Sequence, residues 1–277
     1  MQEFLRRKRT RIERKGNLLA SGGSMLNEER RREILDLLLT EGRVLVRDLS
    51  KKFHTSLITI RKDLEYLHHQ GRLERTHGGA LPLRTGALND RTLEEKERLH
   101  RHEKLGIAAA AARMIRQGQV IILDSGTTTT AIARACRHFR SLTVITNAIN
   151  IAAELAGTSV EVILTGGTLR KNSFSLVGPL AEETLRRLSA DLLFLAVDGF
   201  DLRYGLTTPN LLESRVNRAM ADAARRTIVV CDSSKFGRRS LSLIMPTSSV
   251  HETITDKKVP KHDLKALREA EVKVTLV

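Results

Sequence analysis

The apolar residues between Ser56 and Gly71 recur with the period of an α-helix. Ile60, Leu64 and Leu67 fall on one face, which leaves the charged residues between them on the solvent face. The hydroxyl of Ser56 can accept hydrogen bonds from the first free amides of such a helix, and Gly71 can end it because glycine tolerates a positive φ. The pattern therefore predicts an amphipathic helix that ends just before the glycine.

Two further helical patterns precede this segment. The first begins at Asn27, which can cap it, and runs to about Thr40, while the second is shorter and runs from Val46 to Phe53. Short connections join the three predicted helices, which is typical of a helix-turn-helix unit.

A short hairpin is predicted directly after the third helix. Leu73 and Arg75 alternate as in a strand, and Gly78-Gly79 predicts the turn. A basic helix followed by a small basic hairpin is how a winged helix presents itself to a DNA groove. A three-helix bundle without a nucleic-acid role is the alternative, but it needs neither the hairpin nor so many outward basic groups. We therefore predict a winged helix-turn-helix domain, mainly α with a small β-hairpin.

The second half of the chain alternates between apolar runs of strand length and amphipathic segments of helix length. The apolar runs lie at residues 120–123, 142–145, 160–164, 192–197, 227–231 and 272–276. Fully apolar strands that alternate with helices predict an α/β domain with a mostly parallel sheet covered on both faces. A long helix over residues 91–116, with a break near His102, is expected before the sheet, and the weak pattern over 82–90 predicts a linker.

A polar motif follows the carboxyl end of five of these strands, where open α/β sheets bind their ligands. The motifs are DSGTT at 124–128, TN at 146–147, TGG at 165–167, DGFD at 198–201 and DSSK at 232–235. In the first, the glycine lets backbone amides converge, the threonines add hydroxyl donors, and the helix expected near Thr128 directs its positive end at an anion. A site for a phosphate or a carboxylate is therefore predicted, and a threonine-rich helix cap without a ligand is the alternative.

The motifs give little support to nucleotide hydrolysis, dinucleotide binding or metal binding. DSGTTTT lacks the GxxxxGK[ST] spacing of a nucleotide-hydrolysing loop, and no GxGxxG follows a predicted strand, which argues against a dinucleotide. His100 and His102 point to different faces of a helix, and the adjacent His68 and His69 are no better placed to share a metal ion. We expect neither a cofactor nor a metal site.

The chain is strongly basic, and the excess is densest near its start. Its 277 residues, enough for two domains, carry a formal net charge of +15 and give a pI of about 10.4. Residues 1–84 hold 19 Lys and Arg against 11 Asp and Glu, which attracts phosphates to the predicted winged helix. Aromatic residues make up only 3% of the chain, too few for the stacking platforms that single-stranded nucleic acids need. Duplex DNA is the expected partner, and a merely soluble basic protein is the alternative.

The chain shows no sign of export or of a membrane anchor. Cys136 and Cys231 lie in apolar contexts without CxxC spacing, as reduced core residues do. No apolar run approaches the ~20 residues of a membrane span, and residues 1–24 are basic without the apolar centre of a signal peptide. A cytoplasmic protein is expected. Residues 1–24 form either a disordered basic arm or, because Met25 directly precedes the first helix, a segment upstream of the natural start.

Several motifs, taken together and in order, resemble those of a known family. REILDLLLTEGRVLVRDLSKKF and TIRKDLEYLHHQGRLERTHGGA resemble the N-terminal signature of the DeoR family of bacterial sugar-metabolism regulators, and DSGTTTT, VITN, LTGGTLR, VDGFD, GLT and DSSKFG follow in that family's order. The resemblance spans about residues 25–277. It implies a winged-helix DNA-binding domain over 25–82, a linker and connecting helix over 83–102, and a sugar-phosphate-sensing domain over 103–277 that is similar to ribose-phosphate isomerases.

The resemblance also implies which residues bind. On the DNA side these are Ser56, Leu57, Thr59, Arg61, Lys62, Arg75, His77, Gly78 and Gly79. The implied phosphate site comprises Asp124, Ser125, Gly126, Thr127, Thr128 and Thr129. The residues implied around the sugar are Asn147, Gly167, Arg170, Asp198, Gly199, Asp201, Glu213 and Lys235.

Two positions beside the recognition helix depart from the family's pattern. His54-Thr55-Ser56 replaces the usual Gly-Val-Ser, so His54 is expected in a left-handed turn at some local cost. Leu57 stands where a polar residue is common and can touch a thymine methyl. We expect these changes to affect the operator sequence rather than the DNA-binding role.

By this resemblance the chain is expected to repress a carbohydrate catabolic operon as a dimer or tetramer that a phosphorylated sugar releases from double-stranded operator DNA. Residues from 254 onward look most like regulators of amino-sugar or galactitol-type pathways. An aldose-ketose phosphate isomerase is the alternative, with Glu213 as the base. The lysine that those enzymes carry before the glutamate is missing from residues 202–209, which disfavours catalysis.

Overall fold

The computed structural model describes residues 27–41, 43–70, 72–82 and 90–277, without the side chains of Leu39, Thr40 and Pro82. The chain forms two compact units, residues 1–84 and 85–277. The expected basic extension, the glycine stop at Gly71 and most of the predicted linker lie outside the described residues.

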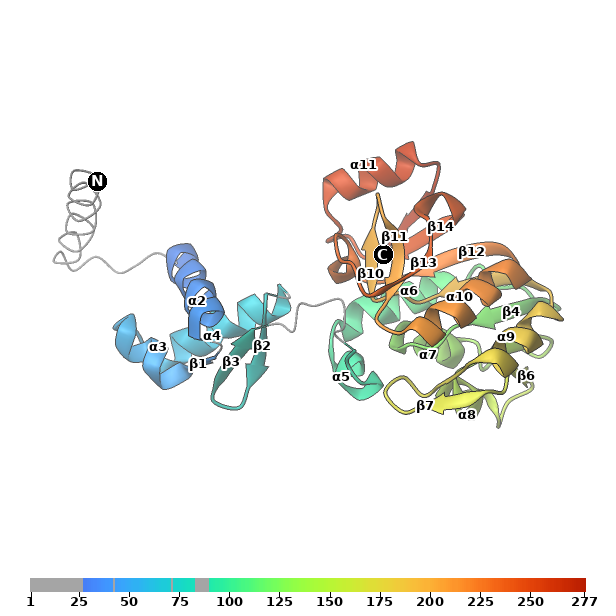
Figure 1. The fold of residues 1–277 in the computed structure, drawn as a ribbon, viewed down its shortest axis with the longest axis horizontal. Helices are drawn as coiled ribbons and strands as arrows, with labels where there is room; N and C mark the ends of the chain where they lie inside the picture. Colours follow the sequence, from blue (N-terminus) through green and yellow to red (C-terminus); the bar gives the residue numbers. More distant parts are fainter. Residues whose placement is uncertain (1–26, 42, 71, 83–89) are drawn as a thin grey trace, which may run out of the picture. The chain divides into compact units, whose positions relative to one another are not determined.

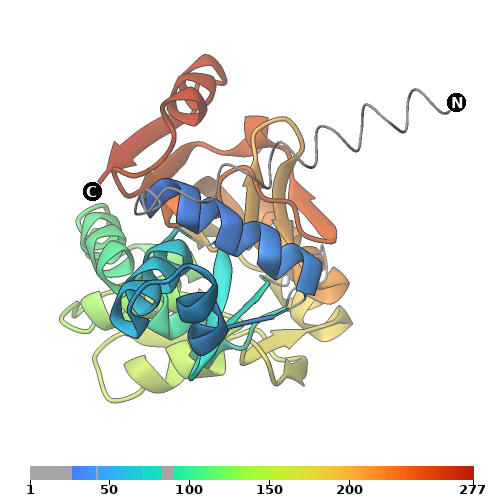
Figure 2. The ribbon, with the colours of Figure 1, turned by 90° about the vertical axis from the view of Figure 1, so that its left-hand side faces the viewer.

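In its described residues the first unit contains three helices and a small antiparallel sheet, as the sequence predicts (Figure 1). The helices are α2 (Asn27–Glu41), α3 (Val46–Lys52) and α4 (Leu57–His69), and the strands are β1 (Val44–Leu45), β2 (Leu73–Thr76) and β3 (Gly79–Pro82). Figure 2 shows the three helices in shades of blue.

A shared apolar core holds these elements together. Ile60, Leu64 and Leu67 are buried on the inner face of α4, as their spacing predicts. Ile34 and Leu38 of α2 belong to the same core cluster. Burying one such side chain contributes about 1.5–3 kcal/mol, so the core fixes which face of α4 remains outside.

The hairpin differs from the prediction in its turn. Thr76 pairs with Gly79, so His77 and Gly78 form the turn and Gly79 begins β3. Strand β3 lies between β2 and β1, and a β-carbon on Gly79 would lie 1.9 Å from the carbonyl oxygen of Val44. Only glycine allows this close approach. Strand β1 escaped prediction because two residues are too few to show a period.

The second unit is built on a seven-stranded parallel sheet, which confirms the predicted α/β class. In spatial order its strands are β15 (Lys273–Leu276), β14 (Glu252–Thr255), β12 (Ala224–Val230), β9 (Ala190–Leu195), β4 (Val120–Leu123), β5 (Thr143–Thr146) and β6 (Glu161–Leu164). Strand β14 escaped prediction because polar residues interrupt its apolar pattern.

Helices cover both faces of this sheet (Figure 1 and Figure 2). On one face pack α6 (Arg101–Ala112), α7 (Thr127–Ala135) and α8 (Ile149–Leu155), and on the other α9 (Pro179–Arg186), α10 (Leu211–Ala223) and α11 (Lys261–Glu269). Ile121 and Leu123 belong to the first core cluster and Ile122 to the second, because successive strand residues point to opposite faces. This two-sided burial explains why strands such as β4 and β9 are apolar on both faces.

Smaller elements that the sequence analysis missed surround the main sheet. They are the antiparallel sheet of β10 (Gly199–Asp201), β11 (Gly205–Thr208) and β13 (Ser242–Met245), the ribbon of β7 (Thr168–Arg170) and β8 (Ser175–Val177), and the 3₁₀ turns η1 (Ser233–Lys235) and η2 (Thr247–Ser249).

The helix predicted over residues 91–116 is two helices. Helix α5 (Leu93–Arg98) is separated from α6 at His100, whose φ is +52°. The buried Lys104 donates a hydrogen bond of 2.7 Å to the carbonyl oxygen of Leu99. This bond gives a partner to a carbonyl group at the C-terminal end of α5 and so stabilises the break. The break lies two residues before its predicted position, and α6 ends four residues early.

Two other features bear on the cellular setting. Cys136 and Cys231 are buried free thiols, as predicted for core residues. In the part of the chain that the structure describes, no helix combines the length and the apolar character that crossing a membrane requires.

Candidate DNA interface and effector site

Ser56 caps the helix that the sequence assigns to a DNA groove. Its Oγ accepts a hydrogen bond of 3.1 Å from the backbone N–H of Thr59. Leu57 is 41% exposed, and Arg61 and Lys62 are exposed one turn later without an ion pair to any described residue. The first two turns of α4 therefore offer apolar and basic groups to a partner.

The turn before α4 has the left-handed residue that the sequence analysis expects. His54 has a φ of +49°, and the hydroxyl of Ser50 donates to the carbonyl oxygen of Thr55 over 2.6 Å. Ile58, the next residue after Leu57, is 64% exposed. Ile58 was not among the predicted DNA contacts, although an apolar residue off the buried face of a helix is a signal for such a contact.

Asp63 is a buried carboxylate on the inner face of α4, and the sequence analysis missed it. Its Oδ2 accepts from Nε of Arg30 over 2.6 Å and its Oδ1 from Nε of Arg31 over 2.8 Å, both on α2. The Arg31 guanidinium also lies 3.8 Å from the centre of the Tyr66 ring. These contacts fix the orientation of α4 on α2. The spacing of Asp63 three residues after the buried Ile60 could have revealed it.

The wing presents fewer side chains than predicted. Arg75 is half-buried and donates to Glu65, which ties the wing to α4. Burial by itself would raise the pKa of Glu65, but the hydrogen bond from Arg75 and its charge hold that pKa below its ordinary value. His77 and Gly78 form the exposed tip, whereas Gly79 is buried in the sheet and does not reach the surface.

In the second unit, the sheet order brings the predicted polar motifs to one edge. Strands β6, β5, β4, β9 and β12 are consecutive neighbours and run parallel. Asn147 follows β5, Asp124 follows β4, Asp198 follows β9 and Asp232 follows β12. The residues beyond these carboxyl ends therefore adjoin one another.

The loop between β4 and α7 has the features of an anion-binding site. Gly126 is the N-cap of α7, and its carbonyl oxygen accepts from the hydroxyl of Thr129 over 2.9 Å. Ser125 and Thr127 are partly exposed, whereas Thr128 and Thr129 are buried. A ligand can thus reach Ser125, Thr127 and the free amides of the first turn, while Thr129 supports the loop from within.

Asp124 is buried at the start of this loop. Its Oδ1 accepts from the N–H of Ser125 over 2.7 Å and its Oδ2 from the N–H of Ala196 over 3.2 Å. Burial, reinforced by the charge of Glu213, raises the pKa of Asp124 to about 8. At neutral pH Asp124 is therefore mostly protonated and adds little negative charge beside an anion.

Arg170 and Glu213 form the centre of a polar cluster. Nη1 of Arg170 donates to Oε1 of Glu213 over 2.9 Å, and its other terminal nitrogen donates to Asp90. The hydroxyl of Ser175 donates to the same Oε1 over 2.9 Å, and that of Thr208 donates to Oε2 over 3.3 Å. Three donors thus hold the Glu213 carboxylate from both sides.

A second ion pair adjoins the first. Nζ of Lys96 lies 2.6 Å from Oδ1 of Asp198. Burial would lower the pKa of Lys96, but the charges of Asp198, Glu213 and Asp90 raise it above its ordinary value. Burial would likewise raise the pKa of Asp198, but Lys96 and Lys235 hold it below its ordinary value. These couplings join both ion pairs and Lys235 into one electrostatic cluster.

Asp90 and Lys96 are cluster members that the sequence analysis missed. Both precede the strand-end motifs by tens of residues, in a stretch without motif chemistry, so the sequence offered no signal for them.

Asn147 and Gly167 frame the same edge. Asn147 is 1% exposed, and its Nδ2 donates to the carbonyl oxygen of Leu176 over 3.3 Å. Its Oδ1 has no hydrogen-bond partner among the described residues, which is costly unless a ligand or water supplies a donor. Gly167 has a φ of +115°, and a β-carbon there would lie 2.7 Å from the carbonyl oxygen of Val177. Its role is close packing.

Asp201 has other partners than the cluster. Its carboxylate accepts the N–H groups of Arg203 and Tyr204 over 3.0 and 2.9 Å and Nε of Arg239 over 2.7 Å. These bonds close the turn between β10 and β11. Gly199, at the other end of β10, serves packing, since a β-carbon there would lie 2.5 Å from a carbonyl oxygen. Among the described residues, the Asp201 carboxylate therefore bonds outside the cluster.

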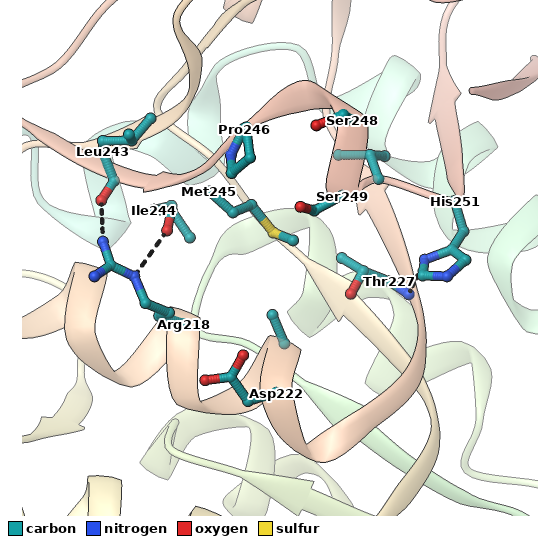
Figure 3. Close-up of a pocket in the computed structure, with 12 residues that line it drawn as sticks. Arg218, Asp222, Thr227, Leu243, Ile244, Met245, Pro246, Ser248, Ser249 and His251 are labelled. Carbon is teal, nitrogen blue, oxygen red and sulfur yellow. Dashed lines mark hydrogen bonds between the residues drawn. The ribbon is translucent and has the colours of Figure 1, made fainter. Parts of the chain in front are cut away.

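A cavity of about 630 Å³ lies at the opposite edge of the sheet, near the start of β12 and β14 (Figure 3). Arg218, Asp222 and His251 line it. The Arg218 guanidinium already donates to the carbonyl oxygens of Leu243 and Ile244 over 3.0 and 3.1 Å, and Asp222 would repel an anion. The charged residues of this cavity therefore do not favour an anionic ligand. No three metal-binding side chains are grouped anywhere in the described residues.

Comparisons with known proteins agree with both units. The DeoR-like helix-turn-helix domain matches residues 30–85, and the DeoR C terminal sensor domain matches residues 99–257. The chain belongs to the DeoR family. It is therefore a DNA-binding transcriptional regulator and not an enzyme.

Two relatives are similar over nearly their whole length. A putative aga operon transcriptional repressor of Escherichia coli O157:H7 is 43% identical over 251 residues, which cover 90% of this chain and 93% of the relative. The HTH-type transcriptional regulator GlpR of Haloferax volcanii is 39% identical over 232 residues, which cover 84% and 91%.

Among solved structures, a ribose 5-phosphate isomerase A from Methanocaldococcus jannaschii is similar over 48% of this chain and 53% of its own. The TM-score is 0.36 and the identity 16%. So limited a likeness says nothing about activity.

Proposed function

We propose that this DeoR-family regulator represses a carbohydrate catabolic operon and leaves its operator when a phosphorylated sugar binds the second unit. The observation that carries the proposal is the presence of two complementary sites on one chain. One is the exposed basic face of α4, and the other is the strand-end edge with Arg170, Glu213 and an anion-binding loop. The E. coli relative is named a putative operon repressor, which supports repression rather than activation.

On the DNA side, α4 enters the major groove of duplex DNA in this proposal. Arg61 and Lys62 supply donors to bases and phosphates, Thr59 adds a hydroxyl, and Leu57 contacts a thymine methyl. The wing tip at His77 and Gly78 touches the backbone beside the groove. A homo-oligomer, dimer or tetramer, places two such helices on repeated half-sites.

On the effector side, the amides at the start of α7 bind the phosphate, and neutral Asp124 avoids repelling it. Arg170, Glu213 and Lys235 surround the sugar, and a sugar hydroxyl satisfies the unpartnered Oδ1 of Asn147. Because Glu213 is held by three donors and no lysine stands in residues 202–209, we assign it to binding rather than to proton abstraction.

The chain divides into three segments with these roles. The DNA-binding domain covers residues 25–82, the connecting segment 83–102 and the sensor 103–277. The regulator acts in the cytoplasm, where its operator and the phosphorylated sugar meet.

Thermal-shift screening of phosphorylated sugars against the full chain tests the effector class. A ligand that binds the folded state alone raises the melting temperature in proportion to the logarithm of its concentration above Kd. We expect one phosphorylated sugar to do so and its unphosphorylated form not to. A sugar that stabilises the chain equally with and without its phosphate would contradict the assignment.

A further inference from the structure

The first described residues of the second unit lie on the polar cluster. Asp90 accepts from Arg170 and, over 3.1 Å, from Nδ2 of Asn172. The N–H of Leu93 donates to the carbonyl oxygen of Asn172 over 2.7 Å. Lys96 then pairs with Asp198, as described above. Residues 90–96 thus contact the cluster through Asp90 and Lys96, and between them Leu93 bonds to the backbone of Asn172.

The helix within this segment is well defined. The hydroxyl of Thr92 accepts from the N–H of Glu95 over 3.3 Å, and the Glu95 carboxylate accepts from the N–H of Thr92 over 2.9 Å. This capping box starts α5, and Lys104 closes its other end. A helix of six residues is unstable by itself, so the loss of an anchor at its start opens its backbone hydrogen bonds.

Arg170 holds Asp90 as it would hold an anionic ligand. A guanidinium offers two forks of N–H donors, and both carboxylates and phosphates match that geometry. The two carboxylates on Arg170 are held unequally. The Glu213 side chain is 9% exposed and has three donors, whereas the Asp90 side chain is 24% exposed and has two. An incoming anion therefore displaces Asp90 more easily than Glu213.

We propose that Asp90 is a built-in competitor for Arg170, and that an anionic effector displaces its carboxylate and so frees residues 90–96, the segment that leads into the sensor from the DNA-binding unit. The inference rests on the proposed function and supplies its regulatory step. By linkage, whatever loosens the Asp90 contact strengthens effector binding, and effector binding loosens the contact. Asp90 and Lys96 are thereby effector-site residues as well as parts of the connecting segment.

The test compares the full chain with Asp90→Asn, which keeps the shape of the side chain and removes its charge. Glu97→Gln is the control, because Glu97 lies on α5, shortly after Asp90, and pairs over 3.2 Å with an arginine, Arg134, outside the cluster. Inorganic phosphate is the probe, titrated at constant ionic strength with chloride. The readouts are the half-saturating phosphate concentration from thermal shift and the hydrogen exchange of the amides of α5.

Asp90→Asn is expected to lower the half-saturating phosphate concentration about tenfold, within the usual range of coupling between sites. The amides of α5 should exchange faster in Asp90→Asn without phosphate and faster in the wild-type chain when phosphate is added. Glu97→Gln should behave as the wild type in both measurements. Asn172→Ala, which removes the second donor to Asp90, should shift the phosphate midpoint in the same direction by a smaller factor.

Three results would overturn the proposal. Asp90→Asn and the wild type could bind phosphate equally well, neither could bind phosphate, or the exchange of the α5 amides could stay unchanged. If the Asp90 variant fails to fold, the Asn172 variant and the wild-type exchange experiment decide. A wild-type chain that prefers its operator but shows none of these effects contradicts this inference alone. Loss of operator preference would instead contradict the proposed function.

Discussion

Nε of Arg30 donates to Oδ2 of Asp63 over 2.6 Å, and this buried pair joins α2 to the middle of the recognition helix. Arg31 approaches the other carboxylate oxygen from the same helix. One acidic residue in a basic surface helix therefore faces inward, where it sets the angle at which Arg61 and Lys62 face outward.

Asp63→Ala should destabilise the winged-helix unit by about 3–5 kcal/mol, because Arg30 and Arg31 both lose the buried carboxylate that they share. Urea denaturation of the full chain, followed by helical circular dichroism, measures the change. Glu33→Gln, on an exposed site of α2, is the control and should leave the transition unchanged. If the free energy of unfolding of Asp63→Ala lies within about 0.5 kcal/mol of the wild-type value, the pair does not hold the two helices together.

Arg61→Ala should weaken operator binding by about 1–3 kcal/mol and relax the preference at one base position, if Arg61 reads a base edge. The measurement is a titration of duplexes that differ at single operator positions. Lys52 is an exposed lysine of α3, and Lys52→Ala is the comparison, because it should weaken binding to all duplexes by the same factor. An equal loss on every sequence would reduce Arg61 to a phosphate contact.

His54→Gly should stabilise the first unit by about 1 kcal/mol. A non-glycine residue with φ near +50° carries a steric cost of roughly 1–2 kcal/mol, and part of the gain is lost to the greater freedom of glycine in the unfolded chain. His54→Ala keeps the cost and should not stabilise. Thermal unfolding of both variants tells relief of backbone strain apart from loss of the imidazole. If His54→Gly and His54→Ala change the melting temperature equally, backbone strain at residue 54 is ruled out.

Asp124 should make the sensor unit less stable as pH rises. Its pKa is about 8 in the folded chain, raised by burial and by the charge of Glu213, against an ordinary value of 3.8. A raised pKa gives stability that is fully present below about pH 4 and is lost as pH rises through about 8. Asp124→Asn, which mimics the neutral form, should flatten this part of the stability profile relative to the wild type. Identical profiles for the two chains between pH 4 and 9 would contradict the raised pKa.

The sequence predicted much of this fold because local patterns carried the information. Ile60, Leu64 and Leu67 revealed the buried face of α4, and the apolar runs revealed six of the seven strands of the parallel sheet. The strand-end motifs predicted which edge gathers polar residues. These features depend on neighbours in the sequence, and period and turn chemistry report them directly.

Much of the rest depends on contacts between residues that are far apart in the sequence, and no local pattern encodes which residues meet. Asp90 meets Arg170 across 80 residues, and Asp63 meets Arg30 across 33. Asp201 looked like a ligand in its motif, yet its carboxylate closes a turn and binds Arg239. The second glycine of the wing looked like a turn residue, but β1, too short to detect, packs over it.

The most direct test of the central claim is a binding titration of the full chain with two duplexes of equal length at moderate salt. One duplex carries the chain's own upstream region, and the other is random. Our account predicts that the upstream duplex binds at least about a thousandfold more tightly, and that the phosphorylated sugar found by thermal shift removes this advantage. Equal affinity for both duplexes, or an advantage that the sugar phosphate leaves untouched, would contradict a ligand-controlled operator-binding regulator.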